Sequence, residues 1–228
     1  MSEYEEQFAR FESDVQNHTL AVLRDDGLYR HLRCSAGSYV YQFDVVTWPG
    51  YLCYSGDMGC FVFTRLPDMF TFFRGRREAM IDRSYLAEKC VASDKHDGIR
   101  EYSEGLFQQA IESDFDSFVE NNDLAPEQAS DLWQLIEDEV LSSGDNRHDA
   151  TGAAMNFRWA PDHIADARGQ EVFPDFWEHR LEDYTPRFWW CCYAIPWAIE
   201  QYDARSASTN GDQAGEGTAS DAVARAAE

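Results

Sequence analysis

The chain has 228 residues and a formal charge of −23, with 42 Asp and Glu against 19 Lys and Arg. This length allows a full hydrophobic core in one domain. Aromatic residues make up 14% of the chain, which excludes a largely disordered protein. The acidity argues against direct binding to nucleic acid or to an anionic membrane, because such binding neutralises phosphates with Lys and Arg. Any partner is therefore expected to be basic.

The first stretch of the chain predicts an amphipathic helix that continues to about Leu23. Its apolar residues recur at spacings of four, three and four; they are Tyr4, Phe8, Phe11 and Val15. The same stretch has no basic region followed by an apolar run, so we expect no secretory signal. No later run reaches the roughly 18 apolar residues of a membrane span. With six cysteines, the chain then fits a reducing cytosol, and we expect free thiols.

Residues from about 28 to 65 predict an antiparallel meander of three or four strands, because β-branched and aromatic runs alternate with turn residues. Pro49-Gly50 suits one hairpin, since proline presets φ and glycine tolerates a positive φ. The stretch 55–59, Ser-Gly-Asp-Met-Gly, suits a second hairpin in which the aspartate accepts from its own downstream amide. Such a sheet has one face to bury, and we expect helices to cover it.

Two short helical segments follow the sheet, around "LPDMFTFFRG" and "SYLAEKCVA", with one basic cluster between them. The cluster consists of Arg74, Arg76 and Arg77. It could bind an anion, but neutralising the acidic body of the protein is the simpler interpretation.

The segment from about 103 to 142 predicts an acidic helical hairpin, with apolar stripes at helical spacing and Pro126 at the first turn of the second helix. From Glu101 to Asn146 there are thirteen Asp and Glu and no Lys, Arg or His. Solubility or a genome-wide acidic bias would explain the same charges without a partner. The candidate partner-binding residues are Glu112, Asp114, Asp116, Glu120, Glu137, Asp138 and Glu139.

The end of the chain divides into a buried helix and a tail. Thr185-Pro186 opens "RFWWCCYAIPWAIEQYDA", which is apolar nearly all round and predicts a core helix over about 186–202. Small and polar residues dominate 204–228, where we expect a disordered tail. The sequence thus predicts an α+β fold: a single domain over 1–203 with a small helix-covered sheet, an acidic helical hairpin and a disordered C-terminal tail.

Four residues in the predicted strands have side chains that bind zinc. His31, Cys34, Cys53 and Cys60 could complete a zinc shell if adjacent strands brought them together. The spacing lacks the two close ligand pairs of most zinc sites, so buried cysteines are the better interpretation. We expect no metal and no cofactor.

Catalysis is the less favoured class, because the sequence has neither a phosphate-binding glycine loop nor a nucleophile elbow. His96-Asp97 and His148-Asp149 suggest a metal-dependent phosphohydrolase of the histidine-aspartate type, but both lie in loop-like sequence.

Asp44 and Asp57 at the sheet edge, with His163 or His179, could divide acid and base roles. Among 42 carboxylates, however, some neighbours are expected by chance.

Two segments, "FDVVTWPGYLCYSGDMGCFVFTRLPDMFTFFR" and "FWWCCYAIPWAIEQYDA", resemble uncharacterised proteins of bacteriophages and prophages. The resemblance leaves out the acidic hairpin and carries no catalytic residues. It implies a genetic context in which small accessory proteins bind and inhibit host machinery, including nucleic-acid-handling defence enzymes. We therefore expect an accessory protein of the host cytosol that binds a basic host protein. A metal-dependent hydrolase with a site near the sheet turn, and an oligomeric structural module, are the alternatives.

Overall fold

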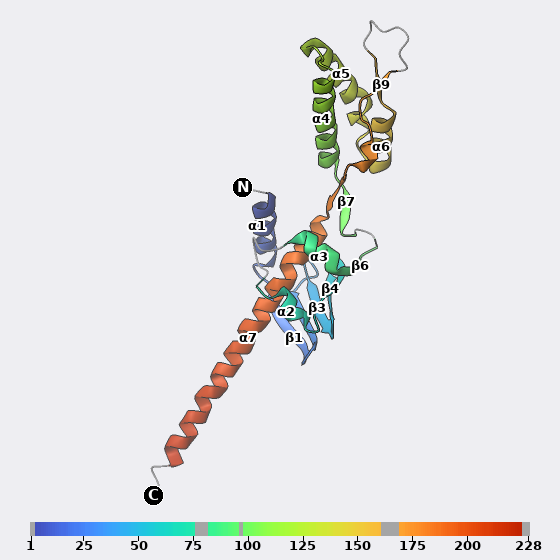
Figure 1. Ribbon diagram of the computed structural model, residues 1–228. Coiled ribbons are helices and arrows are strands. Elements are labelled where there is room, and N and C mark those ends of the chain that lie inside the picture. The colour runs from blue at the N-terminus through green and yellow to red at the C-terminus, as the bar shows by residue number, and fades with distance from the viewer. Residues whose placement is uncertain (1–2, 76–81, 96–97, 161–168, 225–228) are drawn as a thin grey trace. The chain divides into compact units, whose positions relative to one another are not determined.

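The computed structural model describes residues 3–75, 82–95, 98–160 and 169–224. Their fold is α+β, as the sequence predicts, with a six-stranded antiparallel sheet and seven α-helices in the described ranges (Figure 1). Contacts divide the chain into two compact units, which we call the sheet unit (Met1–Ile99 with Tyr184–Glu228) and the helical unit (Arg100–Asp183). The sequence predicts one domain over 1–203, and within it the two units bury separate clusters of apolar side chains.

The sheet is larger than the predicted three or four strands. Helix α1 (Glu3–Val15) leads into β1 (Thr19–Asp26), β2 (Tyr29–Ser35), β3 (Phe43–Trp48), β4 (Tyr51–Gly56) and β5 (Gly59–Thr64), and β6 (Cys90–Ser93) completes the order β1-β2-β3-β4-β5-β6. Strand β1 lies where the first helix was expected to continue to Leu23. It forms because it pairs with β2 over its length, as in the Val22–Leu32 pair, and this pairing partner is not visible in local periodicity.

Three further helices contact the same face of the sheet unit: α2 (Met69–Phe73), α3 (Arg83–Lys89) and α7 (Pro186–Ala224), which lies across the sheet (Figure 1). Every residue of α7 from Phe188 to Ile199 is buried, which confirms the predicted core helix. Thr185 begins it: its hydroxyl accepts a hydrogen bond from the Phe188 N–H at 3.2 Å, in the manner of an N-cap.

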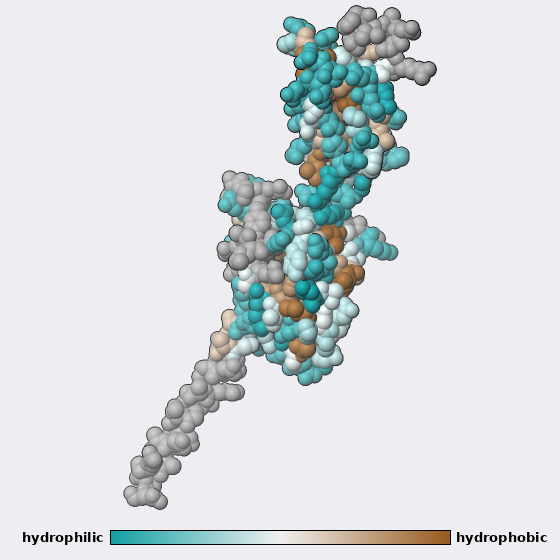
Figure 2. Space-filling view, in the orientation of Figure 1, coloured by the Kyte–Doolittle hydropathy of each residue, from teal (hydrophilic) through white to brown (hydrophobic). Residues whose placement is uncertain are grey.

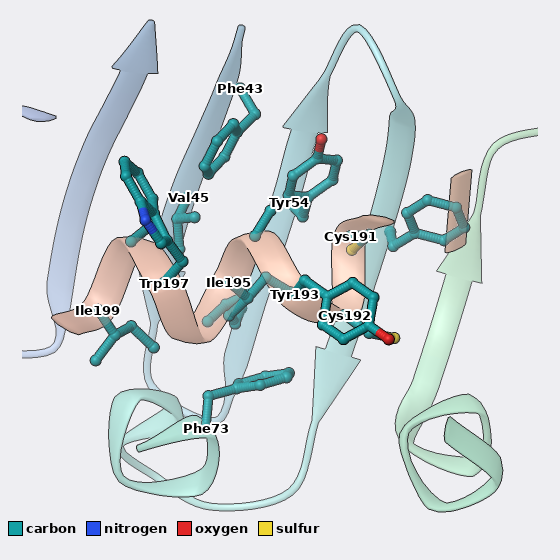
Figure 3. Close-up of a cluster of buried hydrophobic side chains, with 14 of the residues drawn as sticks. Phe43, Val45, Tyr54, Phe73, Cys191, Cys192, Tyr193, Ile195, Trp197 and Ile199 are labelled. Atoms are coloured by element: carbon teal, nitrogen blue, oxygen red, sulfur yellow. The ribbon is translucent and has the colours of Figure 1, made fainter. Parts of the chain in front are cut away.

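The core is built on the alternation of the central strands. Residues 43, 45 and 47 of β3 are buried, and the residues between them lie on the opposite face. Figure 3 shows Phe43, Val45 and Tyr54 of the sheet facing Ile195 and Trp197 of α7.

Helix α7 continues through Ala224, into the range 204–228 where the sequence predicts a disordered tail. Near the predicted boundary its side chains still bond to the sheet unit. The Tyr202 hydroxyl donates to Asp25 at 2.8 Å, and Asp203 accepts two hydrogen bonds from Arg74, each at 2.9 Å. Residues 225–228 lie outside the described ranges.

The helical unit contains α4 (Glu104–Asn121), α5 (Pro126–Glu139) and α6 (Arg147–Asn156), the 3-10 helices η2 (Leu141–Ser143) and η3 (Phe176–Glu178), and short strands β8 (Arg158–Trp159) and β9 (Gln170–Glu171). Strand β7 (Arg100–Tyr102) pairs with β10 (Glu182–Tyr184). In the described residues no helix has both the length and the apolar character needed to span a membrane.

Helices α4 and α5 form the predicted hairpin. The Ser103 hydroxyl accepts from the Leu106 N–H at 3.2 Å and so caps α4, and Pro126 occupies the first turn of α5. Phe115 and Trp133 lie at similar distances from the connecting turn, and their ring centroids are 4.9 Å apart. This pairing gives the two helices an antiparallel arrangement.

The close packing of Gly56 in the β4–β5 hairpin can be tested by substitution. A methyl group added at Gly56 would lie 2.3 Å from the Gln42 oxygen and 2.7 Å from the Phe43 Cα, both in the backbone. We expect Gly56→Ala to lower the free energy of unfolding by about 1–3 kcal/mol, measured by urea denaturation. The neighbouring exposed Ser55 provides the control, since Ser55→Ala should change stability by no more than about 0.5 kcal/mol. Equal stability of the two variants would contradict this packing.

Candidate functional site: an acidic helical surface

The negative charge of the protein is concentrated in the helical unit. Arg100–Asp183 contains 21 Asp and Glu against five Arg and no Lys, whereas the rest of the chain contains 21 against 14 basic residues. The helical unit therefore carries a formal charge of −16 out of −23. Figure 2 shows that the visible face of this unit is largely hydrophilic.

The candidate residues on α4 do not all have the same surroundings. Glu112, Asp116 and Glu120 are exposed and stand four residues apart, on one face of the helix. Asp114 is half-buried instead, and its Oδ2 is hydrogen-bonded to Nε2 of His179 at 2.9 Å. Asp114 therefore links α4 to His179, and its carboxylate is less available to a partner than the sequence suggests.

The candidate residues on α5, Glu137, Asp138 and Glu139, are all exposed. Glu137 accepts a hydrogen bond from Nε1 of Trp133 at 3.0 Å, which holds the indole ring beside the carboxylates.

A hollow of about 290 Å³ lies between the two helices of the hairpin. Its lining residues are Glu112, Phe115, Asp116 and Trp133. Both rings are half-buried, and their planes are tilted by 60°. Aromatic faces attract a cation, and a carboxylate can accept two hydrogen bonds from a guanidinium. We call this feature the aromatic hollow; its chemistry is complementary to an arginine or lysine side chain.

The sequence places Phe115 and Trp133 on the inner stripes of the hairpin, and their spacing alone predicts core residues. The structure leaves them partly accessible at the edge of the helix pair. Only the packing of one helix on the other creates the hollow, so helical periodicity could not reveal it.

Asp57 has a structural role in the hairpin turn. Its Oδ2 accepts from the Tyr41 N–H at 2.9 Å, and its own N–H donates to the Gln42 oxygen at 3.0 Å. Gly59 adopts φ +97°, as the predicted turn requires.

Asp44 lies on the sheet face opposite the core. Its carboxylate accepts two hydrogen bonds from Arg33, each at 2.8 Å, and one from His31 at 2.9 Å. Burial would raise the pKa of Asp44, but the hydrogen bonds from Arg33 and His31 outweigh it and hold the pKa below its usual value. A carboxylate that is ionised and shared in this way is a poor proton donor. Asp44 and Asp57 thus have separate structural partners.

The metal candidates lie on opposite faces of the sheet. Cys34 is buried in the core, whereas His31, Cys53 and Cys60 lie on the other face, because a spacing of three along a strand reverses the side-chain direction. Cys53 and Cys60 have their sulfur atoms 3.9 Å apart, and burial raises the pKa of Cys53 to about 12. Within the described ranges no cluster of three or more His, Cys, Asp or Glu could hold a metal ion.

The structure describes one of the two dyads of the histidine-aspartate hypothesis, His148-Asp149. His148 and Asp149 lie in the first turn of α6, exposed, and not in a loop as expected, because the Asn146 side chain caps that helix by accepting from the Asp149 N–H at 3.0 Å. His96-Asp97 and His163 lie outside the described residues.

In the basic cluster, Arg74 is bound by Asp203, and Arg76 and Arg77 lie outside the described residues.

Comparison with models of protein families, with curated proteins and with solved structures found no match to this chain. No activity or partner is therefore transferred from another protein. The acidic surface and its aromatic hollow have the chemistry of a binding site for cationic groups.

The hydrogen bonds of Asp44 with Arg33 and His31 make the stability of the fold depend on pH. Because the pKa of Asp44 is lowered in the folded state, its stabilising contribution is present above the unfolded-state pKa of about 3.9 and is lost as the pH falls through the folded value. We expect Asp44→Asn to cost about 1 kcal/mol at pH 7 and clearly less at pH 3, measured by urea denaturation. Glu6→Gln, at an exposed position of α1, should show little effect at either pH. A cost for Asp44→Asn that does not change with pH would contradict the assignment.

Proposed function

We propose that the protein acts by binding, and that the acidic surface of its helical unit captures a basic protein partner. The observation that carries the proposal is the stripe of Glu112, Asp116 and Glu120 on α4. Like charges four residues apart on a helix are destabilising, by about 0.2–0.5 kcal/mol per pair. The stability of α4 therefore does not explain why three carboxylates share this face, and attraction of a cationic surface would give them a role.

The proposed mechanism is electrostatic attraction followed by local recognition. Exposed carboxylates on α4 and α5 take the place of phosphates on a surface that is built to bind them. Attraction of this kind speeds association at low salt and weakens as the screening length falls to about 10 Å at 0.1 M salt. The aromatic hollow adds a defined position for one basic side chain, since a guanidinium can stack on Trp133 while it bonds to Asp116.

The genetic context of the proposal comes from the resemblance to phage and prophage proteins. In that context the protein is a cytosolic accessory factor, and its partner is a basic host protein, such as a nucleic-acid-handling or defence enzyme. The acidic surface would then inhibit its partner by covering the groups that bind phosphate. The resemblance supports the context alone, because the resembling segments belong to the sheet unit and the acidic surface belongs to the helical unit.

Neither alternative function has a comparable observation in its favour. For a hydrolase near the sheet turn, the described carboxylates Asp44 and Asp57 are each engaged by structural partners. For an oligomeric module, the acidity of the helical unit would oppose close approach of two copies of that unit.

The first test of the proposal is charge reversal on α4. The triple variant with Glu112, Asp116 and Glu120 changed to Lys should lose the basic proteins that the original protein captures from nuclease-treated host lysate and releases at moderate salt. Mass spectrometry of the salt fractions identifies them. The control reverses Glu6, Asp26 and Glu88, exposed carboxylates of the sheet unit, and changes the net charge equally. If both triple variants retain the same proteins, the proposed surface is wrong.

A second test addresses the aromatic hollow with a defined ligand. Trp133→Ala should weaken binding of an arginine-rich peptide about fivefold, or about 1 kcal/mol, because the stacking surface is lost while every carboxylate remains. Isothermal titration calorimetry measures the change. Trp177, which is 61% exposed in the same unit, provides the control, since Trp177→Ala should leave the affinity unchanged. Equal effects of the two substitutions would remove the hollow from the binding site.

A further inference from the structure

The sheet unit contains a separate pocket of about 230 Å³ between α1 and the beginning of α7. All of its lining residues belong to this unit; they are Gln7, Arg10, Asp14, Tyr41, Met58, Pro186, Trp189, Trp190 and Tyr193. At about 30 Å³ per water molecule, this volume corresponds to roughly seven or eight waters. The pocket is therefore large enough for a group of side-chain size and too small for a nucleotide.

Four of the nine lining residues of the pocket are aromatic. Tyr41 is stacked on Trp190, with ring centroids 5.8 Å apart and planes inclined by 17°. Trp189 is stacked on Tyr193, with centroids 6.0 Å apart and planes inclined by 23°. The faces of such rings carry a negative quadrupole, so a group of aromatic walls favours a positive charge.

The backbone of Tyr41 is held in a conformation that a tyrosine rarely adopts. Its φ is +54°, a strain that costs on the order of 1–3 kcal/mol. Two hydrogen bonds hold it there: its N–H donates to Asp57, and its carbonyl oxygen is bonded to Nε2 of His18 at 3.0 Å. Backbone strain of this kind is typical of ligand sites. The β4–β5 turn thus places both Tyr41 and Met58 in the pocket wall.

Helix α1 supplies the polar side of the pocket. Gln7, Arg10 and Asp14 are three and four residues apart and so share one helix face. Asp14 is half-buried, and its Oδ2 accepts a hydrogen bond from Nε1 of Trp190 at 3.1 Å, which holds the carboxylate beside the ring. Arg10 is exposed at the same side.

The same aromatic cluster already receives a cation from within the chain. The guanidinium of Arg83 lies over the ring of Trp189 and also 5.8 Å from the ring centroid of Tyr184. One lining residue of the pocket, Trp189, therefore already makes a cation–π contact. The sheet unit itself carries a formal charge of −7, from 21 Asp and Glu against 14 Lys and Arg, which favours cations over anions.

We propose that this pocket binds an organic cation with an alkylammonium or guanidinium head, whose charge lies against Trp190 and Tyr41 with Asp14 as its counter-ion. The inference is independent of the proposed function, because it concerns a different unit and different residues. The cation could belong to a free small molecule or to a basic side chain of a polypeptide; both present the same head group to the pocket.

The test is a calorimetric titration of the full-length protein with three blocked amino acids: the amides of N-acetyl-trimethyllysine, N-acetyl-arginine and N-acetyl-norleucine. We expect saturable binding of at least one of the two cations, at least tenfold tighter than that of neutral norleucine. Equal binding of norleucine, or no binding of either cation, would overturn the proposal.

Two substitutions on α1 test the sign of the charge. Asp14→Asn, in which the amide oxygen can still accept from Trp190, should weaken binding of the cation at least fivefold. Arg10→Gln, at an exposed position, should strengthen it. Glu6→Gln removes one negative charge elsewhere on the same helix and should have little effect. The opposite pattern, weaker binding with Arg10→Gln and tighter binding with Asp14→Asn, would indicate an anion site and overturn the proposal.

Two further measurements distinguish a polypeptide side chain from a free small molecule, and the pocket from the acidic surface. Tighter binding of a peptide that contains trimethyllysine or arginine than of the blocked amino acid would assign the pocket to a polypeptide side chain, and the reverse order to a free small molecule. Both orders support a cation site. The triple charge reversal on α4 should leave binding of the blocked cations within about twofold, so the pocket can succeed or fail separately from the acidic surface.

Discussion

Burial of the first half of α7 against the sheet is the interaction on which the rest of the sheet unit depends. Every residue from Phe188 to Ile199 is buried, and each large apolar side chain contributes roughly 1.5–3 kcal/mol when it leaves water. This helix contacts the helices α1, α2 and α3 and the strands β1, β2 and β5. The same helix also supplies Trp189, Trp190 and Tyr193 to the wall of the pocket, so it contributes to both the core and the proposed cation site.

The two units use their carboxylates in different ways. In the sheet unit several of them bind neighbouring arginines: Asp44 pairs with Arg33, and Asp68 receives two hydrogen bonds from Arg30, the shorter at 2.8 Å. In the helical unit the carboxylates far outnumber the basic residues, so most of the charge has no internal arginine to neutralise it. Charge that the fold does not use is available for association, which is why the acidic surface is the stronger candidate site.

The hairpin turn at residues 56–59 connects local structure to the proposed pocket. Glycine at position 56 is required because any side chain would collide with the backbone of Gln42 and Phe43, and Asp57 is required because it bonds to the Tyr41 N–H. What the sequence presents as a turn is therefore also the support of a strained tyrosine in an aromatic wall.

The sequence by itself determined the α+β class, the two tight hairpins, the helices of the acidic hairpin and the buried start of α7, because each depends on turn chemistry or apolar periodicity within a short stretch. Tertiary structure alone decided the pairing of β1 and β6 into the sheet, the separation into two units, and the meeting of Phe115 with Trp133 and of Tyr41 with Trp190. These features join residues far apart in the chain, and periodicity within one segment carries no information about which distant segment will pack against it.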